Sequence, residues 1–93
     1  MIVSFRCKET EKLFRRKMTR LMDVRLQKHA YRKLVMLNAA SVLDDLRVPP
    51  GNRLEALSGD RNGQYSIRIN QQYRICFCWD SGRVTDVQII DYH

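Results

Sequence analysis

The sequence predicts an α+β domain in which two N-terminal helices, preceded by a short first strand, pack on one face of an antiparallel β-meander sheet. Apolar residues recur with the helical period in the first half of the 93-residue chain and alternate with polar residues in the second half. Between the halves, two prolines and a glycine in Val48–Asn52 end the helical pattern. A chain this short is expected to form one domain, residues 1–93, with one modest core.

The N-terminal elements are expected to be a strand and a helix. The apolar run Ile2–Phe5 predicts the short first strand. Segment 8–21 follows as a helix, with two glutamates in its first turn, where acids suit the positive end of the helix dipole. Its apolar residues have helical spacing and should face the core: Phe14, Met18 and Leu21.

A second, longer helix is predicted over roughly Val24–Leu46. Leucine and alanine recur there at i, i+4, i+8 and i+11, which is the spacing of one helix face. The residues at this spacing are Leu26, Ala30, Leu34 and Leu37. Basic residues of the same segment, Lys28 and Arg32 among them, fall on the polar side and are candidates for contacts with a polyanion.

The remaining chain predicts a β-meander. Alternation of apolar and polar residues covers segments 64–70, 73–79 and 84–93, with a turn at Asp80–Arg83. Because successive side chains of a strand point to opposite faces, the large apolar residues of the middle segment should all face the helices. These residues are Tyr73, Ile75, Phe77 and Trp79. The residues between them, which include Arg74, then lie on an open face of the sheet.

The charge of the chain is strongly positive. Its formal net charge is +7, and 11 of its 17 lysines and arginines fall between Arg6 and Lys33, where only three acids stand. Such a surface favours a polyanionic partner: nucleic acid, an anionic membrane or an acidic protein. The alternative is a solvated helix surface that keeps a small protein in solution.

Cysteine and histidine usage argues against an exported protein and against a metal centre. The three cysteines are an odd number, no signal peptide is recognisable, and no apolar run approaches the roughly 20 residues that cross a bilayer. We therefore expect a cytoplasmic protein without a membrane partner. The two histidines lie far apart, and Cys76 and Cys78 suit small core filling better than metal binding, so no metal or other cofactor is expected.

One face of the predicted sheet gathers polar groups around Arg74. If segments 64–70 and 73–79 pair with an even register sum, Arg68 comes close to Arg74. Like charges facing across a sheet are destabilising, so such a pair suggests a bound anion. For Arg68 the sequence favours the alternative, a guanidinium that extends into water or pairs with an acid. For Arg74 we expect a functional role, because the apolar residues of its strand should hold it in place.

The last three residues, Asp91, Tyr92 and His93, add three groups that exchange protons. Alternation places Tyr92 on the open face near Arg74, with His93 beside it. A cation, a phenol and an imidazole suit metal-free RNA cleavage, in which the 2′-OH attacks its own phosphate with the help of a base, a cation and an acid. The alternative is an ordinary surface pair of histidine and arginine, which contributes little.

The stretch "NRLEALSGDRNGQYSIRINQQYRICFCW" and the final "DVQIIDYH" resemble the HigB branch of the RelE/ParE toxin superfamily. The similarity extends to "IVSFRCKETEKLF" and to "RKLVMLNAASVLDDLRVPP", and so covers nearly the whole chain. Three motifs carry it together: "L-x-G-D-R-x-G", "S-I-R-I-N-x-x-Y/W-R-I-x-F" and a terminal "D-Y-H".

This resemblance implies a RelE-like fold and a ribosome-dependent mRNA endonuclease that inhibits translation. It also implies a HigA-type antitoxin whose helix-turn-helix domain links the complex to operator DNA. By the same resemblance Arg74 stabilises the phosphate, His93 acts as general acid or base, Tyr92 orients or stacks on a base, and Asp91 positions its neighbours. The basic residues, including Lys28 and Arg32, would then contact RNA.

The sequence departs from the family pattern at two positions. Ser58 stands where relatives often have a lysine before "G-D", and Glu55 stands where some carry a histidine. We therefore expect a weak enzyme, unless Arg53, Arg61 or Arg68 supplies the missing charge. Two alternatives remain: a non-catalytic ParE-like inhibitor of a protein target such as gyrase, and a plain module that binds an acidic antitoxin.

Overall fold

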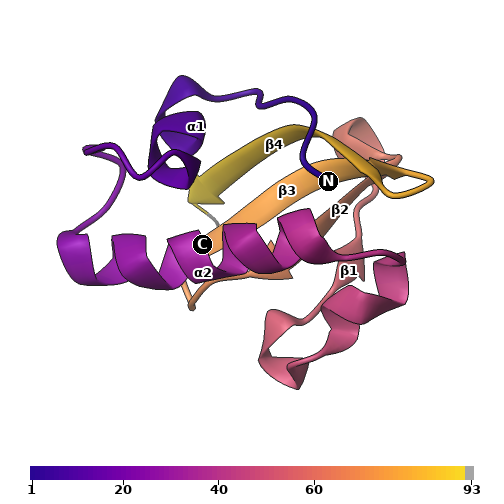
Figure 1. Cartoon of the computed structure of the whole chain (residues 1–93). Coiled ribbons are helices and arrows are strands. Elements are labelled where there is room, and N and C mark those ends of the chain that lie inside the picture. The colour runs from indigo at the N-terminus through magenta and orange to yellow at the C-terminus, as the bar shows by residue number, and fades with distance from the viewer. Residues whose placement is uncertain (92–93) are drawn as a thin grey trace.

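In a computed structural model that describes residues 1–91, the chain forms two α-helices, three short 3₁₀ helices and a four-stranded sheet (Figure 1). The α-helices are α1 (Lys8–Phe14) and α2 (Val24–Ala39), and the 3₁₀ helices are η1 (Leu43–Arg47), η2 (Pro50–Asn52) and η3 (Gly59–Arg61). The strands are β1 (Glu55–Ala56), β2 (Gln64–Arg68), β3 (Tyr73–Asp80) and β4 (Arg83–Asp91). They lie in chain order with every neighbouring pair antiparallel, which confirms the predicted α+β class.

The core lies between the helices and the sheet. α2 crosses in front of the strands, and α1 lies beside the end of β4 (Figure 1). Leu34 and Leu37 of α2 and Phe77 of β3 have no solvent exposure. Tyr73 and Trp79 are partly buried and pack against this core, so the face predicted for the β3 aromatic residues is confirmed.

α1 ends at Phe14 rather than at the predicted Leu21. Arg16 takes a left-handed conformation with a φ of 60°, and the N–H groups of Arg16 and Lys17 donate to carbonyls of the last helical turn at 3.0 and 2.8 Å. This is a Schellman ending, in which the left-handed position is usually a glycine. Because the helix stops there, Met18 is 91% exposed, and the prediction that it faces the core was wrong.

α2 also ends earlier than predicted, at Ala39 instead of Leu46. The Asp45 carboxylate accepts hydrogen bonds from the N–H groups of Ser41 and Val42 at 2.9 and 3.2 Å. Such local side-chain acceptors compete with helical hydrogen bonds, and here they begin the separate turn η1. Within residues 1–91, no helix is both long and apolar enough to cross a bilayer.

The apolar run Ile2–Phe5 forms two isolated parallel bridges with β4 instead of the predicted strand. The bridges join Ile2 to Val84 and Phe5 to Val87. Between them β4 bulges, since its register with β3 shifts there. At the bulge Asp86 has a φ of 53° and its N–H donates to the Ser4 Oγ at 3.0 Å, so a regular ladder cannot form.

Candidate functional site

β2 and β3 bring Arg68 and Arg74 together. The two residues are direct partners in the antiparallel register, as the sequence predicts from an even register sum. Arg74 is only 7% exposed, and Ser66 and Cys76, which neighbour it on this part of the sheet, are fully buried. The prediction of an open face was therefore wrong at this point, because the chain around Arg53 covers it.

The guanidinium of Arg74 is held from two sides. Its Nε donates to the Ser66 Oγ at 2.8 Å. Its Nη2 donates to the backbone carbonyl of Arg53 at 2.7 Å and, at 3.4 Å, to that of Ser66. Ser66 is a site residue that the sequence reasoning missed, although it stands two residues before Arg68 and so on the same face of β2. The result is a fixed positive charge near the start of β3.

Arg74 forms part of a pocket of about 270 Å³. We call it the arginine pocket, and its lining residues are Arg53, Glu55, Arg68, Asn70, Gln71 and Arg74. Three arginines and one glutamate therefore line one cavity. Guanidiniums bind phosphate and carboxylate groups in a planar, bidentate manner, so the pocket suits an anionic ligand.

The turn before β1 supplies Arg53, and β1 supplies Glu55. The buried amide of Asn52 donates to the Leu46 carbonyl at 3.1 Å and anchors this segment to the body of the protein. Arg53 then adopts a left-handed φ of 46°, which for a non-glycine residue costs about 1–3 kcal/mol and persists only where surrounding contacts hold it. Here the hydrogen bond from Arg74 holds it, and Glu55 Oε1 lies 3.9 Å from the Arg74 Nη2.

The turn between β2 and β3 supplies the other wall of the arginine pocket. The Asn70 Oδ1 accepts hydrogen bonds from the N–H groups of Gln72 and Tyr73 at 2.9 and 2.7 Å. The Nε of Arg68 donates to the Asn70 carbonyl at 3.0 Å, so Arg68 is half-buried and does not simply extend into water. The turn is closed by its own side chains, and this closure orients Arg68.

Of the three C-terminal residues predicted for the site, Asp91 is described and Tyr92 and His93 lie outside the described residues. Asp91 is exposed, pairs with Tyr73 across β3 and β4, and its Oδ2 accepts a hydrogen bond from the Gln72 Nε2 at 3.1 Å. β4 therefore ends one residue pair away from Arg74, which pairs with Ile90.

The other predicted RNA contacts lie apart from the arginine pocket. Arg61 stands in η3 and its Nη1 donates to the Gln64 Oε1 at 3.4 Å. Lys28 and Arg32 line a larger depression of about 460 Å³, bordered by α1, the loop 15–23 and the first half of α2. We call it the helical groove, and its basic residues are Arg16, Lys17, Lys28 and Arg32. The structure thus places Arg53 and Arg68 in the arginine pocket and Lys28 and Arg32 in the helical groove, and Arg61 lines neither.

Two further positions bear on the chemistry of the site. Burial raises the pKa of the Cys76 thiol, against the opposing influence of the Arg61 and Arg74 charges, so this cysteine stays protonated as core filling. Ser58 is exposed and precedes η3, and it is not among the described residues that line the arginine pocket. The positions that bring cations to Arg74 are Arg53 and Arg68.

This sheet with its two helices defines a RelE-like toxin fold. A chain of the heterotetrameric YoeB–YefM toxin–antitoxin complex from Staphylococcus aureus superposes with a TM-score of 0.63 at 20% identity, covering 100% of this chain and 95% of that one. YafQ from Escherichia coli strain BL21(DE3) superposes with a TM-score of 0.62 at 13% identity, covering 98% and 91%. At these identities the likeness concerns the fold alone.

Within that class the chain belongs to the family of HigB-like toxins. The family model for the RelE-like toxin of the type II toxin–antitoxin system HigB matches residues 3–93. Toxin HigB-1 of Vibrio cholerae serotype O1 is 42% identical over 83 residues, which cover 88% of this chain and 87% of that protein. The resemblance drawn from the sequence motifs is thereby confirmed.

Proposed function

We propose that this HigB-like toxin is a metal-independent endoribonuclease that cleaves mRNA on the ribosome. The observation that carries the proposal is the arginine pocket, which three arginines and one glutamate line. A guanidinium stays charged at any physiological pH and matches the geometry of phosphate oxygens. The pocket therefore offers a phosphodiester both the charge and the proton acceptor that its cleavage requires.

The reaction is an internal transfer. The ribose 2′-oxygen gives its proton to a base and attacks the neighbouring phosphorus, forming a new O–P bond. The bond from phosphorus to the 5′-oxygen breaks, and that oxygen receives a proton from an acid. The products are a 2′,3′-cyclic phosphate and a free 5′-OH, and neither a metal ion nor a redox partner enters the balance.

Arg74 stabilises the negative charge that builds on the phosphate. Its hydrogen bonds to the Ser66 hydroxyl and to the Arg53 carbonyl hold the guanidinium before substrate arrives. A charge that needs no reorganisation stabilises a transition state better than a mobile one. Arg53 and Arg68 line the same pocket. They supply further positive charge for the RNA phosphates on either side of the cleaved bond.

Proton transfer is assigned to Glu55 and His93. The Glu55 carboxylate lies 3.9 Å from the Arg74 guanidinium and is half exposed, so a bound strand can reach it. In this arrangement Glu55 accepts the proton of the 2′-OH, and His93, whose ordinary pKa is near neutrality, donates to the leaving oxygen. Tyr92 orients the substrate base, and Asp91 positions the end of β4.

Two partners complete the proposed function. A chain of this size cannot enclose an mRNA, so the ribosome holds the strand and presents it to the arginine pocket. A HigA-type antitoxin with a helix-turn-helix domain holds the toxin inactive in the cytoplasm and carries the complex to operator DNA. The family assignment supports a toxin–antitoxin pair, and the net charge of +7 suits both an RNA substrate and an acidic partner.

The test is cleavage of a short mRNA by the purified toxin, with and without programmed ribosomes, followed by mapping of the new 5′ ends. We expect cuts inside codons, only in the presence of ribosomes, and downstream fragments that begin with a 5′-OH. A variant lacking His93 is expected to bind antitoxin normally and to leave the mRNA intact. Growth arrest by the native toxin with intact mRNA would instead favour the ParE-like inhibitor.

A further inference from the structure

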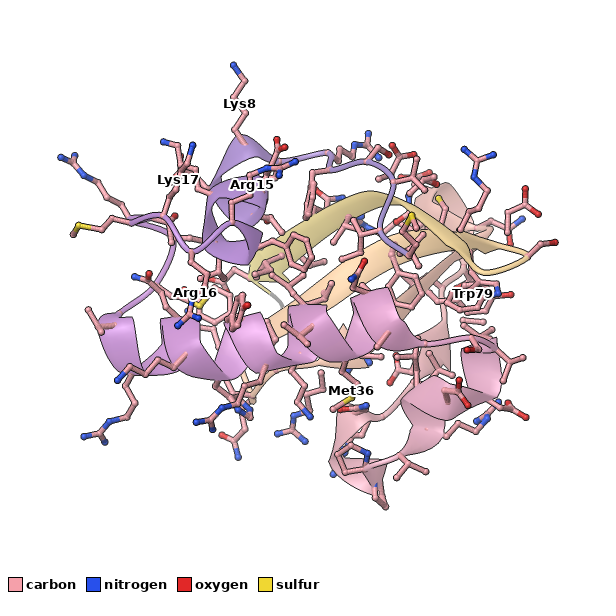
Figure 2. The ribbon with its side chains drawn as sticks, viewed as in Figure 1. Lys8, Arg15, Arg16, Lys17, Met36 and Trp79 are labelled. Carbon is pink, nitrogen blue, oxygen red and sulfur yellow. The ribbon has the colours of Figure 1, made fainter. Side chains whose placement is uncertain are left out.

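The helical groove combines exposed apolar side chains with a basic rim. Met18 and Val24 are 91% and 69% exposed, although both are large apolar residues. Four basic residues border them, and among the described residues no acidic side chain lines the groove. Figure 2 shows Arg16 between α1 and α2, whereas Lys8 at the start of α1 points away from the body of the protein.

The groove is preformed, because the loop 15–23 that makes one wall is held at several points. The Thr19 Oγ1 donates to the Glu9 Oε1 at 2.6 Å and accepts from the Leu21 N–H at 3.1 Å. From α2, the Gln27 Nε2 donates to the carbonyls of Thr19 and Met22 at 3.1 and 2.7 Å. Met18 is therefore displayed by an anchored loop rather than by a frayed one.

One cation of the rim is also held in place. The guanidinium of Arg16 lies over the ring of Tyr31, with its Cζ 5.0 Å from the ring centroid. Both residues line the groove. A partner that binds here meets a positioned cation beside an aromatic surface, which reduces the side-chain entropy that binding must remove.

The chemistry of the groove selects among possible occupants. A second copy of this chain carries the same net charge of +7 and would be repelled. A phosphate backbone neutralises cations but leaves Met18 and Val24 in water. An acidic protein segment with apolar side chains satisfies both features, since its carboxylates meet the rim while its apolar residues cover the exposed ones.

We propose that the helical groove is the docking site for an acidic, apolar-anchored segment of the antitoxin. This inference rests on the antitoxin partner of the proposed function but not on RNA cleavage. It also reassigns Lys28 and Arg32, which the sequence had placed among RNA contacts, to a protein interface. No residue lines both the helical groove and the arginine pocket, so the antitoxin segment docks apart from the proposed catalytic residues.

The test measures the Kd of the full-length toxin for its cognate antitoxin, with two matched pairs of variants. Val24→Asp is compared with Val48→Asp, because both valines are 69% exposed and only Val24 lines the groove. Lys28→Glu is compared with Lys8→Glu, which changes the net charge equally at an exposed position outside the groove. Thermal unfolding of each variant confirms that it is folded.

We expect each groove variant to weaken antitoxin binding by about 10-fold or more, as loss of a central interface contact does, and each control to stay within about 2-fold. Equal losses in both members of a pair would overturn the proposal, because the effect would then be one of net charge. Retained antitoxin binding with lost ribosome binding would also overturn it and would make the groove an RNA surface. Absence of cleavage by the native toxin would refute the proposed function and leave the Kd comparison valid.

Discussion

The arginine pocket and the helical groove are built in opposite ways from the same basic composition. In the arginine pocket, Arg74 is 7% exposed and its guanidinium is fixed by hydrogen bonds to a hydroxyl and to a carbonyl. In the helical groove, Met18 is 91% exposed and the cations lie at the rim. In the arginine pocket, a hydroxyl and a backbone carbonyl accept hydrogen bonds from one guanidinium and fix it. In the helical groove, apolar side chains stay exposed to solvent.

The difference indicates a division of labour. Stabilising a developing charge requires a cation that does not move, and paired strands supply that rigidity. Binding a protein segment requires exposed apolar area, which a loop between helices can display. A single small domain can thus separate its proposed chemistry from the binding of its proposed partner, provided that substitutions at one surface leave the other unaffected.

The largest effect is expected from Glu55→Gln, which keeps the size of the side chain and removes its capacity to accept a proton. If Glu55 is the base for the 2′-OH, single-turnover cleavage on programmed ribosomes should fall by about 10²–10⁴-fold. Antitoxin affinity should not change, since Glu55 does not line the helical groove. Asp60→Asn is the control, and an unchanged rate in the Glu55 variant would remove this carboxylate from the mechanism.

A slightly smaller loss is expected from Arg74→Lys. A planar guanidinium bridges two oxygens and reaches both Ser66 and the Arg53 carbonyl, whereas an ammonium is a point charge. Cleavage should slow by about 10²–10³-fold, the scale for one preorganised electrostatic contact. The exposed Arg83 provides the matched Arg→Lys control. Near-native activity of the Arg74 variant would mean that charge alone suffices and that the fixed geometry has no role.

A moderate effect on stability and on antitoxin binding is expected from Thr19→Val. The hydrogen bond from Thr19, and then the contacts with Lys12, lower the pKa of Glu9 below its ordinary value of 4.5. Stability from a depressed carboxyl pKa is fully present above 4.5 and disappears as the pH falls through the folded-state pKa. The variant should therefore have a lower thermal midpoint than the native protein at pH 7, and this difference should shrink on acidification below the Glu9 pKa.

The measurement for Thr19→Val is the thermal midpoint in a series of buffers from pH 7 downward through the acidic range, with Thr85→Val as the control. Antitoxin affinity should decrease as well, because Thr19 anchors the loop that displays Met18. Cleavage activity should stay at the native level. A pH-independent difference between variant and native protein would show that the Glu9 contact does not stabilise the loop.

The smallest effect is expected from Ser58→Lys, which restores the lysine that relatives often carry. Arg53 and Arg68 already bring positive charge to Arg74, and Ser58 is exposed. The cleavage rate should change by less than about 5-fold, which corresponds to about 1 kcal/mol for an exposed charge. Ser41→Lys serves as the control. A rate increase of about 10²-fold or more would mean that the pocket arginines do not replace the lysine. It would support the expectation, drawn from the sequence, of an enzyme weakened by the missing lysine.

Much of the fold could be predicted because its signals are local. The period of the apolar residues identifies α2, β2 and β3, and alternation with an even register sum places Arg68 opposite Arg74. The end of α1 could not be predicted, since it depends on an arginine, not a glycine, in the left-handed position at residue 16. Because the helical spacing of apolar residues continues past that point to Met18, the sequence predicted that Met18 is buried, whereas it is exposed.

The site was predicted in part for the same reason. Arg74 follows from strand alternation and from the family resemblance, but its burial follows from contacts between distant segments. The carbonyl that accepts the hydrogen bond from the Arg74 Nη2 belongs to Arg53, 21 residues away. No pattern in the sequence predicts the two-residue strand β1 beside it. Such tertiary contacts decide which of several arginines share a cavity, and so they separated Arg53 and Arg68 from Lys28 and Arg32.

The bridges between Ile2–Phe5 and β4 have a consequence for the solubility of the chain. β4 spans Arg83–Asp91 at one edge of the sheet, and it is rich in valine and isoleucine. An uncovered edge strand of this length and composition is a template for pairing with another copy, which leads to aggregation. The N-terminal segment covers that edge from Val84 to Val87, and the bulge at Asp86 distorts it further. The first residues of the chain thus leave fewer unpaired backbone groups on β4 for another copy to pair with.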